Sequence, residues 1–129
     1  MKYTIELEQV LSERQIKKEN IVYMTIKQIY LQQMREGTKT VEYRDTTNFY
    51  IKKFFKMSTA NRIEIQKSTT HLLLQGGYNP DSPRILIELK GIMIYGRKYP
   101  SELDVSRCDI YGYLMNLVLG EITYDSTLD

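Results

Sequence analysis

Three ionisable side chains, Lys39, Glu42 and Arg44, lie in one short segment that begins at Gly37. Residues two apart on a β-strand point to the same face, about 6–7 Å from each other, so Glu42 and Arg44 would be neighbours on a strand. Lys39 would sit at the bend before that strand, and its long stem can reach over the same face. The segment therefore predicts a cluster of two cations and one carboxylate.

Such a cluster supports two kinds of chemistry. The cations can hold a phosphate or a carboxylate through charge-assisted hydrogen bonds, and a lysine beside a glutamate can transfer protons to and from a substrate. The candidate ligand-binding residues in this cluster are therefore Lys39, Glu42 and Arg44, and the candidate catalytic residues are Lys39 and Glu42. The structural alternative is an exposed ladder of surface ion pairs, which are common and weak.

The residues before the cluster predict a strand that leads directly into a helix. Residues 21–24 are rich in strand formers, and Thr25 followed by Gln28 has the form of a capping box. The helix should end at Gly37, because glycine adopts the left-handed cap conformation most easily. Its predicted apolar face consists of Ile26, Ile29, Tyr30 and Met34.

A second strand is predicted over residues 40–44, with Thr40, Glu42 and Arg44 on one face. Residues 46–57 predict a basic, aromatic helix or a structured loop. The rest of the chain is mainly β. Strand patterns occur around Ile63 and Ile65, over residues 72–74, over 85–95 and over 115–124, with a bulge or bend at Gly120 and a short helical turn at 100–105.

These elements predict one α+β domain over residues 1–129, with a helical extension over residues 1–20. We expect a small β-barrel or a strongly curved mixed sheet with flanking helices. The 129 residues suffice for one core, the net charge is +2, and the one cysteine, Cys108, allows no internal disulfide. No apolar run is long enough for a membrane helix, so we expect a cytoplasmic chain with no membrane partner and no cofactor.

The pattern Gly-x-Lys-x-x-Glu-x-Arg at Gly37, Lys39, Glu42 and Arg44 resembles the signature of the ASCH family, a branch of the PUA-like β-barrel folds. The order of the predicted elements is also similar to that family, including a late Leu-Gly-Glu-Ile strand over residues 119–122. The resemblance covers residues 21–124. It leaves residues 46–57 and the first twenty residues unmatched.

The resemblance implies a PUA-like domain that binds RNA or a nucleotide in a cleft where Lys39, Glu42 and Arg44 converge, and it adds the signature glycine, Gly37, to the candidate ligand-binding residues. Some relatives are ribonucleases, or amidohydrolases of acetylated cytidine that use the motif lysine with a threonine and a glutamate. Glu42 stands here in place of that threonine, and Thr40 is the nearest substitute. The resemblance therefore favours binding over hydrolysis.

Two further groups are weaker candidates. His71, the only histidine, could act as a general base, but a local hydrogen bond on a strand explains it more simply; without a cysteine cluster or a second histidine, no metal site is predicted. Lysines interleave with Phe54 and Phe55 over residues 52–56, as on surfaces that stack single-stranded bases. An amphipathic helix that buries both phenylalanines is the alternative.

Three functions are consistent with these patterns. The first is an RNA- or nucleotide-binding domain, with Lys39 and Arg44 on phosphate and Glu42 orienting them. The second is a hydrolase acting on RNA or a modified nucleoside, and the third is a non-catalytic protein-interaction domain. We rank binding first because the motif favours an anionic ligand and no complete catalytic set is present.

Overall fold

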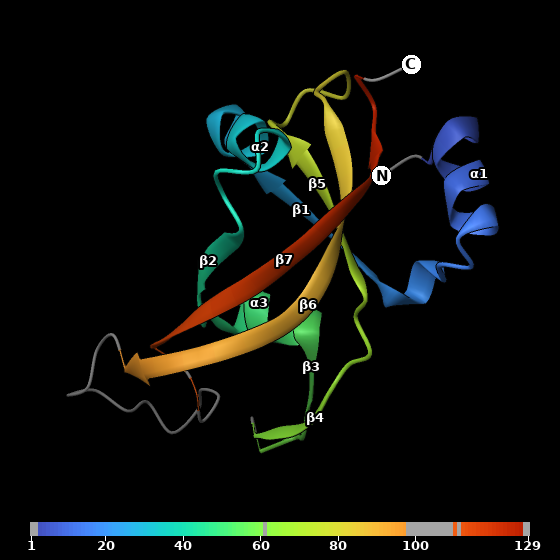
Figure 1. The fold of residues 1–129 in the computed structure, drawn as a ribbon. Helices are drawn as coiled ribbons and strands as arrows, with labels where there is room; N and C mark the ends of the chain where they lie inside the picture. Colours follow the sequence, from blue (N-terminus) through green and yellow to red (C-terminus); the bar gives the residue numbers. More distant parts are fainter. Residues whose placement is uncertain (1–2, 61, 98–109, 111, 128–129) are drawn as a thin grey trace. The chain divides into compact units, whose positions relative to one another are not determined.

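The computed structural model describes residues 3–60, 62–97, 110 and 112–127 (Figure 1). Its elements, in chain order, are α1 (Ile5–Glu13), the 3-10 helix η1 (Lys18–Asn20), β1 (Ile21–Ile26), α2 (Gln28–Arg35), β2 (Val41–Asp45), α3 (Asn48–Phe54), β3 (Phe55–Met57), β4 (Ile63–Gln66), β5 (His71–Gly76), β6 (Arg84–Arg97) and β7 (Tyr113–Asp125). The predicted turn at residues 100–105 and Cys108 lie outside the described residues.

The strands form a mixed five-stranded sheet in the order β1-β5-β6-β7-β2, and β3 pairs with β4 in a separate two-stranded sheet. β1 and β5 run parallel, whereas β5 pairs with β6 and β2 pairs with β7 in antiparallel fashion. Helices α1 and α2 belong to the same compact unit as strands β1 and β5. The predicted α+β class, with a mixed sheet and flanking helices, is confirmed.

The chain divides into two compact units, and each is described by itself. Unit 1 comprises Met1–Thr40, Thr69–Lys90 and Leu119–Asp129, and unit 2 comprises Val41–Ser68 and Gly91–Val118. Each of β6 and β7 contributes one part to unit 1 and the other part to unit 2. Cooperative folding of residues 1–129 as one domain stays a prediction.

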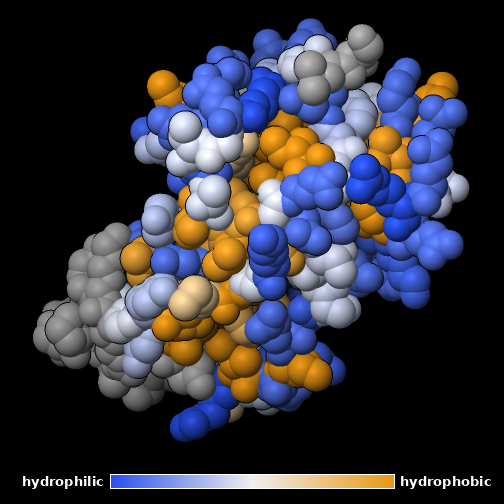
Figure 2. Space-filling view, viewed as in Figure 1, coloured by the Kyte–Doolittle hydropathy of each residue, from blue (hydrophilic) through white to orange (hydrophobic). Residues whose placement is uncertain are grey.

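Unit 1 is built around β5 and the first part of β6. Leu73 and Leu86 are fully buried, and α1 packs Leu7 and Leu11 against them. The N-terminus of α1 is capped by Thr4, whose hydroxyl oxygen accepts a 3.2 Å hydrogen bond from the Leu7 amide. The face of α1 seen in Figure 2 is mainly hydrophilic. The helix predicted within the first twenty residues is thus confirmed.

The predicted start of α2 is wrong. β1 buries alternate residues up to and including Ile26, so Thr25 lies in the strand, and the helix begins only after Lys27, which makes no side-chain cap. The inward face of α2 also differs from the predicted one, because packing on the sheet decides which face of a helix is buried. Leu31 and Met34 are buried, whereas Ile29 (62% exposed) and Tyr30 (37%) are not.

The predicted end of α2 is confirmed. Gly37 has a positive φ of 79° and donates its amide hydrogen to the Met34 carbonyl at 3.2 Å. The Thr38 amide donates to the Gln33 carbonyl at 3.0 Å, so the helix ends in a Schellman motif. This ending directs the chain from α2 towards residues 39–44.

The C-terminal end of β7 is held firmly to α2. Arg35 Nε lies 2.7 Å from Asp125 Oδ2, and Arg35 Nη2 lies 2.9 Å from Asp125 Oδ1. The amide and hydroxyl of Thr127 also donate to Asp125 Oδ1. Asp125 is only 8% exposed, so this end of β7 is anchored within unit 1.

Unit 2 contains β2, α3 and the β3–β4 hairpin. Helix α3 buries Ile51 and Phe54 and leads directly into β3, whose first residue, Phe55, is 8% exposed. The mixture of helix and strand over residues 48–57 explains why neither pattern was clear in the sequence. Lys67 donates to the Lys52 carbonyl at 2.7 Å, which joins the end of the hairpin to α3.

Candidate functional site

Strand β2 places Glu42 and Arg44 on its buried face. In the antiparallel register Glu42 lies opposite Leu117 and Arg44 opposite Met115, and both of these apolar partners are fully buried. Glu42 Oε2 lies 2.9 Å from Arg44 Nη1, with the two side chains 3% and 17% exposed. The same-face prediction is confirmed, and the alternative of an exposed surface ladder is wrong.

A carboxylate this deeply buried must be compensated, because removing a charge from water costs several kcal/mol. Arg44 supplies the opposite charge, and the Tyr43 amide donates to Glu42 Oε1 at 3.3 Å. The guanidinium of Arg44 is planar and donates in a fixed geometry, so its orientation is set by the buried carboxylate. Glu42 therefore acts as a rigid support for Arg44.

Arg44 also contacts an aromatic ring on α3. Its guanidinium carbon lies 5.3 Å from the centroid of the Tyr50 ring, a cation–π distance. Tyr50 is positioned by the helix cap, since its amide donates to the Thr47 hydroxyl oxygen at 3.4 Å. Thr46, 1% exposed, fixes the connection between β2 and α3 through hydroxyl contacts with the carbonyls of Ile110 (2.6 Å) and Tyr113 (2.7 Å).

These contacts border a depression of about 450 Å³ that lies within unit 2. Its lining residues are Tyr43, Arg44, Asp45, Thr47, Tyr50 and Leu114. The depression thus offers a guanidinium, a carboxylate, a threonine hydroxyl and an aromatic ring. This combination suits a ligand that carries an anion, hydrogen-bond donors and a flat ring.

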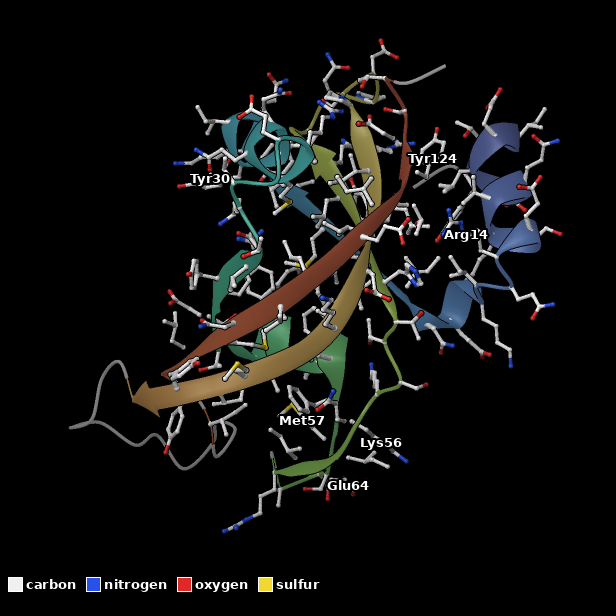
Figure 3. All side chains as sticks on the ribbon, in the orientation of Figure 1. Arg14, Tyr30, Lys56, Met57, Glu64 and Tyr124 are labelled. Atoms are coloured by element: carbon white, nitrogen blue, oxygen red, sulfur yellow. The ribbon has the colours of Figure 1, made fainter. Side chains whose placement is uncertain are left out.

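Lys39 belongs to unit 1 and contacts Tyr30 of α2, which Figure 3 labels. Its ammonium nitrogen lies 4.8 Å from the centroid of the Tyr30 ring, and that of Lys27 lies 5.9 Å from the same centroid. The structure therefore brings Glu42 and Arg44 together and assigns Lys39 a contact of its own. Convergence of all three side chains on one ligand stays a prediction.

Helix α3 presents an aromatic and cationic surface that the sequence reasoning missed. Phe49 is 65% exposed, and its ring lies edge-on to Tyr50, with centroids 5.1 Å apart and an interplanar angle of 83°. Lys53 Nζ lies 4.9 Å from the Phe49 centroid. The phenylalanines singled out in the sequence, Phe54 and Phe55, are buried instead, Phe54 at the end of α3 and Phe55 in β3. Their predicted burial is confirmed, and the prediction that one helix carries both is wrong.

Thr47 is the sequence signal that could have revealed this surface. As the N-cap it marks the start of α3, and the 3.6-residue period then fixes the helical phase, with Phe49 and Lys53 on a different face from Ile51 and Phe54. The alternation of lysines and phenylalanines over residues 52–56 concealed that phase. The helical period thus predicts that Phe49 lies on a different face from Ile51, and packing in unit 2 decides which face is buried.

His71 behaves as a structural residue on β5. Its Nδ1 lies 2.8 Å from the Thr70 hydroxyl, which confirms the predicted local hydrogen bond. Burial lowers the pKa of His71, although the neighbouring carboxylate of Glu88 partly opposes that change. Across the described residues, no group of three or more His, Cys, Asp or Glu side chains could hold a metal ion.

Comparison with known proteins identifies no relative. No family model matches this chain, and no curated protein or solved structure matches it. The likeness to the ASCH family therefore rests on Gly37, Lys39, Glu42 and Arg44, and membership of that family stays a prediction. None of the helices in the described part of the chain has the length and apolar character needed to cross a bilayer.

Proposed function

We propose that this chain binds RNA or a nucleotide at the depression in unit 2. The observation that carries the proposal is the position of Arg44, which the buried Glu42 holds against the Tyr50 ring at the edge of that depression. Arg44 Nη1 is held by Glu42 and by the Tyr43 carbonyl, to which it donates at 3.3 Å, and the positive charge fixed in this way attracts a phosphate. The adjacent ring can stack on a base.

The carboxylate of Asp45 makes the site more suitable for a nucleotide than for a simple anion. Asp45 lines the same depression as Arg44 and would repel part of the charge of inorganic phosphate. A nucleotide has amino or hydroxyl donors beside its phosphate, which a carboxylate can accept. Each charged side chain of the depression then has a complementary group on the ligand.

The distribution of charge along the chain also supports an anionic ligand. Residues 41–68 of unit 2 carry six basic side chains against three acidic ones, an excess larger than the net charge of +2 for the whole chain. The basic residues are Arg44, Lys52, Lys53, Lys56, Arg62 and Lys67, and the acidic residues are Glu42, Asp45 and Glu64. Such local concentration attracts phosphate backbones at long range.

The hydrolase alternative requires Glu42 to exchange protons with a substrate. Its carboxylate is 2% exposed and is engaged by Arg44 and by the Tyr43 amide. This arrangement favours binding, with Glu42 orienting Arg44, over catalysis by Glu42. The ASCH resemblance separately predicts a role in ligand binding for Gly37 and Lys39, which belong to unit 1.

A salt-dependent fluorescence-anisotropy titration tests the proposal. Wild type, Arg44→Ala and Lys39→Ala would be titrated with a short single-stranded RNA, a duplex RNA and mononucleotides, followed by chromatography of each mixture to detect reaction products. Arg62→Ala is the matched control, because it removes the same charge at an exposed position of unit 2 outside the depression. Thermal melts would confirm that each variant is folded.

We expect wild-type affinity to fall as salt rises and Arg44→Ala to weaken binding about tenfold or more, beyond any effect of Arg62→Ala. A product that disappears in Lys39→Ala would favour the hydrolase alternative. No binding by the wild type, or equal losses in Arg44→Ala and Arg62→Ala, would reject the proposed site. If the wild type binds none of these ligands, the protein-interaction alternative would replace the proposed binding function.

A further inference from the structure

We infer that the ligand is a single nucleic-acid strand with two neighbouring bases splayed apart, one on Tyr50 and the next on Phe49. This inference rests on the proposed function and deepens it from a nucleotide to a strand. It follows from the arrangement of two aromatic rings on α3 and two cations, Arg44 of β2 and Lys53 in the last turn of α3.

Each ring has a cation of its own. Arg44 lies over Tyr50 at 5.3 Å, and Lys53 lies over Phe49 at 4.9 Å, both measured to the ring centroid. Surfaces that bind single strands combine stacking rings with cations that follow the backbone. Two such pairs with centroids 5.1 Å apart therefore predict two adjacent nucleotide positions.

The angle between the two rings favours a single strand over a duplex as the ligand. The planes of Phe49 and Tyr50 are inclined by 83°, so bases stacked on them would be nearly perpendicular to each other. In a duplex, neighbouring bases lie parallel and about 3.4 Å apart. A single strand can splay its bases onto separate side chains, whereas a duplex would have to break its stacking.

Phe49 is available because the core positions of α3 are filled by other residues. Ile51 and Phe54 are both 0% exposed, whereas Phe49 is 65% exposed. Replacing Phe49 should therefore change little in the packing of unit 2. This property allows its role in binding to be separated from any role in folding.

The test compares a mononucleotide, the corresponding dinucleotide, a longer single-stranded RNA, the same strand in DNA and a duplex RNA. The variant is Phe49→Leu, which keeps apolar bulk and removes the ring. Tyr78→Leu is the control, since it removes an aromatic ring that is 89% exposed in unit 1. RNA and DNA both offer bases that can stack on the two rings, so the comparison of the RNA strand with the DNA strand shows which of them the chain binds more tightly.

We expect Phe49→Leu to weaken dinucleotide and single-strand binding at least about fivefold and to leave mononucleotide binding unchanged. Phe49→Trp should retain tight binding, and Tyr78→Leu should have no effect. Wild type should prefer the single strand to the duplex. Suppose that wild type binds the mononucleotide through Arg44, but Phe49→Leu binds the dinucleotide as tightly as wild type does. In that case, or if wild type binds the duplex as tightly as the single strand, this inference is wrong and the proposed function still stands. If Arg44→Ala has no effect on any ligand, the proposed function fails as well.

Discussion

The carboxylate of Glu42 lies 2.9 Å from the guanidinium of Arg44, on a strand face otherwise occupied by apolar partners. A pair of this kind adds little stability compared with apolar residues of the same volume, but breaking it leaves an uncompensated buried charge. Its clearest consequence is the fixed orientation of Arg44 beside Tyr50. Four substitutions test this relationship and the contacts that shape each unit.

Glu42→Gln should lower the free energy of unfolding by about 1.5–3 kcal/mol, because the charged hydrogen bond to the half-buried Arg44 is lost. Urea denaturation at neutral pH would measure the change. Glu64→Gln is the matched control, since Glu64 lies exposed on β4, and a surface change of this kind should alter stability by less than about 0.5 kcal/mol. Similar losses in the free energy of unfolding for the two variants would show that Glu42 does not stabilise Arg44.

Gly37→Ala should lower the free energy of unfolding by about 1 kcal/mol, because Gly37 has a φ of +79°. No heavy atom lies within 4 Å of the added Cβ, so the cost comes from the backbone alone. Gly37→Asn should cost less, since asparagine tolerates this conformation. Gly96→Ala, also free of contacts but without a positive φ, should be neutral or slightly stabilising. A neutral Gly37→Ala would contradict the assigned helix ending.

Asp125→Asn should lower the free energy of unfolding at neutral pH by about 1.5–3 kcal/mol, the usual worth of a charged hydrogen bond. Burial by itself would raise the pKa of Asp125, but hydrogen bonds from Arg35 and Thr127 outweigh it and hold the pKa below its ordinary value. The stabilisation is therefore present above the ordinary aspartate pKa and is lost as the pH falls through the lower pKa of the folded chain.

Urea denaturation at a series of acidic pH values would check this dependence. The difference between wild type and Asp125→Asn should be largest at neutral pH and should shrink on acidification. Asp81→Asn, at an exposed loop position, provides the control for the loss of one carboxylate. A difference between wild type and Asp125→Asn that grows on acidification would contradict the predicted sign.

Gly120→Ala should destabilise unit 1, because the Cβ would overlap the carboxylate of Glu88 and lie 3.1 Å from the Glu88 Cβ. We expect a loss of about 1–3 kcal/mol, as for other overpacked positions. In a Glu88→Ala background the loss should be smaller, since the overlapping carboxylate is gone. A double-mutant cycle measured by urea denaturation would show this coupling, and strictly additive losses would contradict the close approach.

Much of the local structure could be predicted from the sequence because it depends on neighbouring residues. The alternation of β2 correctly placed Glu42 and Arg44 on one face, and Gly37 correctly marked the end of α2. The long strand patterns correspond to β6 and β7. β7 continues through Gly120, where the expected interruption is replaced by close packing of Glu88.

The errors occurred where burial, which is a tertiary property, outweighed a local signal. The capping pattern at Thr25 yielded to the burial of Ile26 on the sheet, and α2 buries Leu31 where the apolar pattern predicted Ile29. The phenylalanines that resembled a stacking surface instead fill the core of unit 2. Local propensity could not anticipate these outcomes because it contains no information about which face will be covered.

The amino-acid sequence by itself determined the strand period, the helix ending at Gly37 and the presence of one carboxylate and one guanidinium on the same face of β2. These features follow from backbone conformation and side-chain alternation over a few residues. Only the tertiary structure decided that this face is buried, that Arg44 is held against Tyr50 and that Phe49 stays exposed. Those outcomes require strands and helices distant in sequence to pack together, because burial depends on partners that no local pattern specifies.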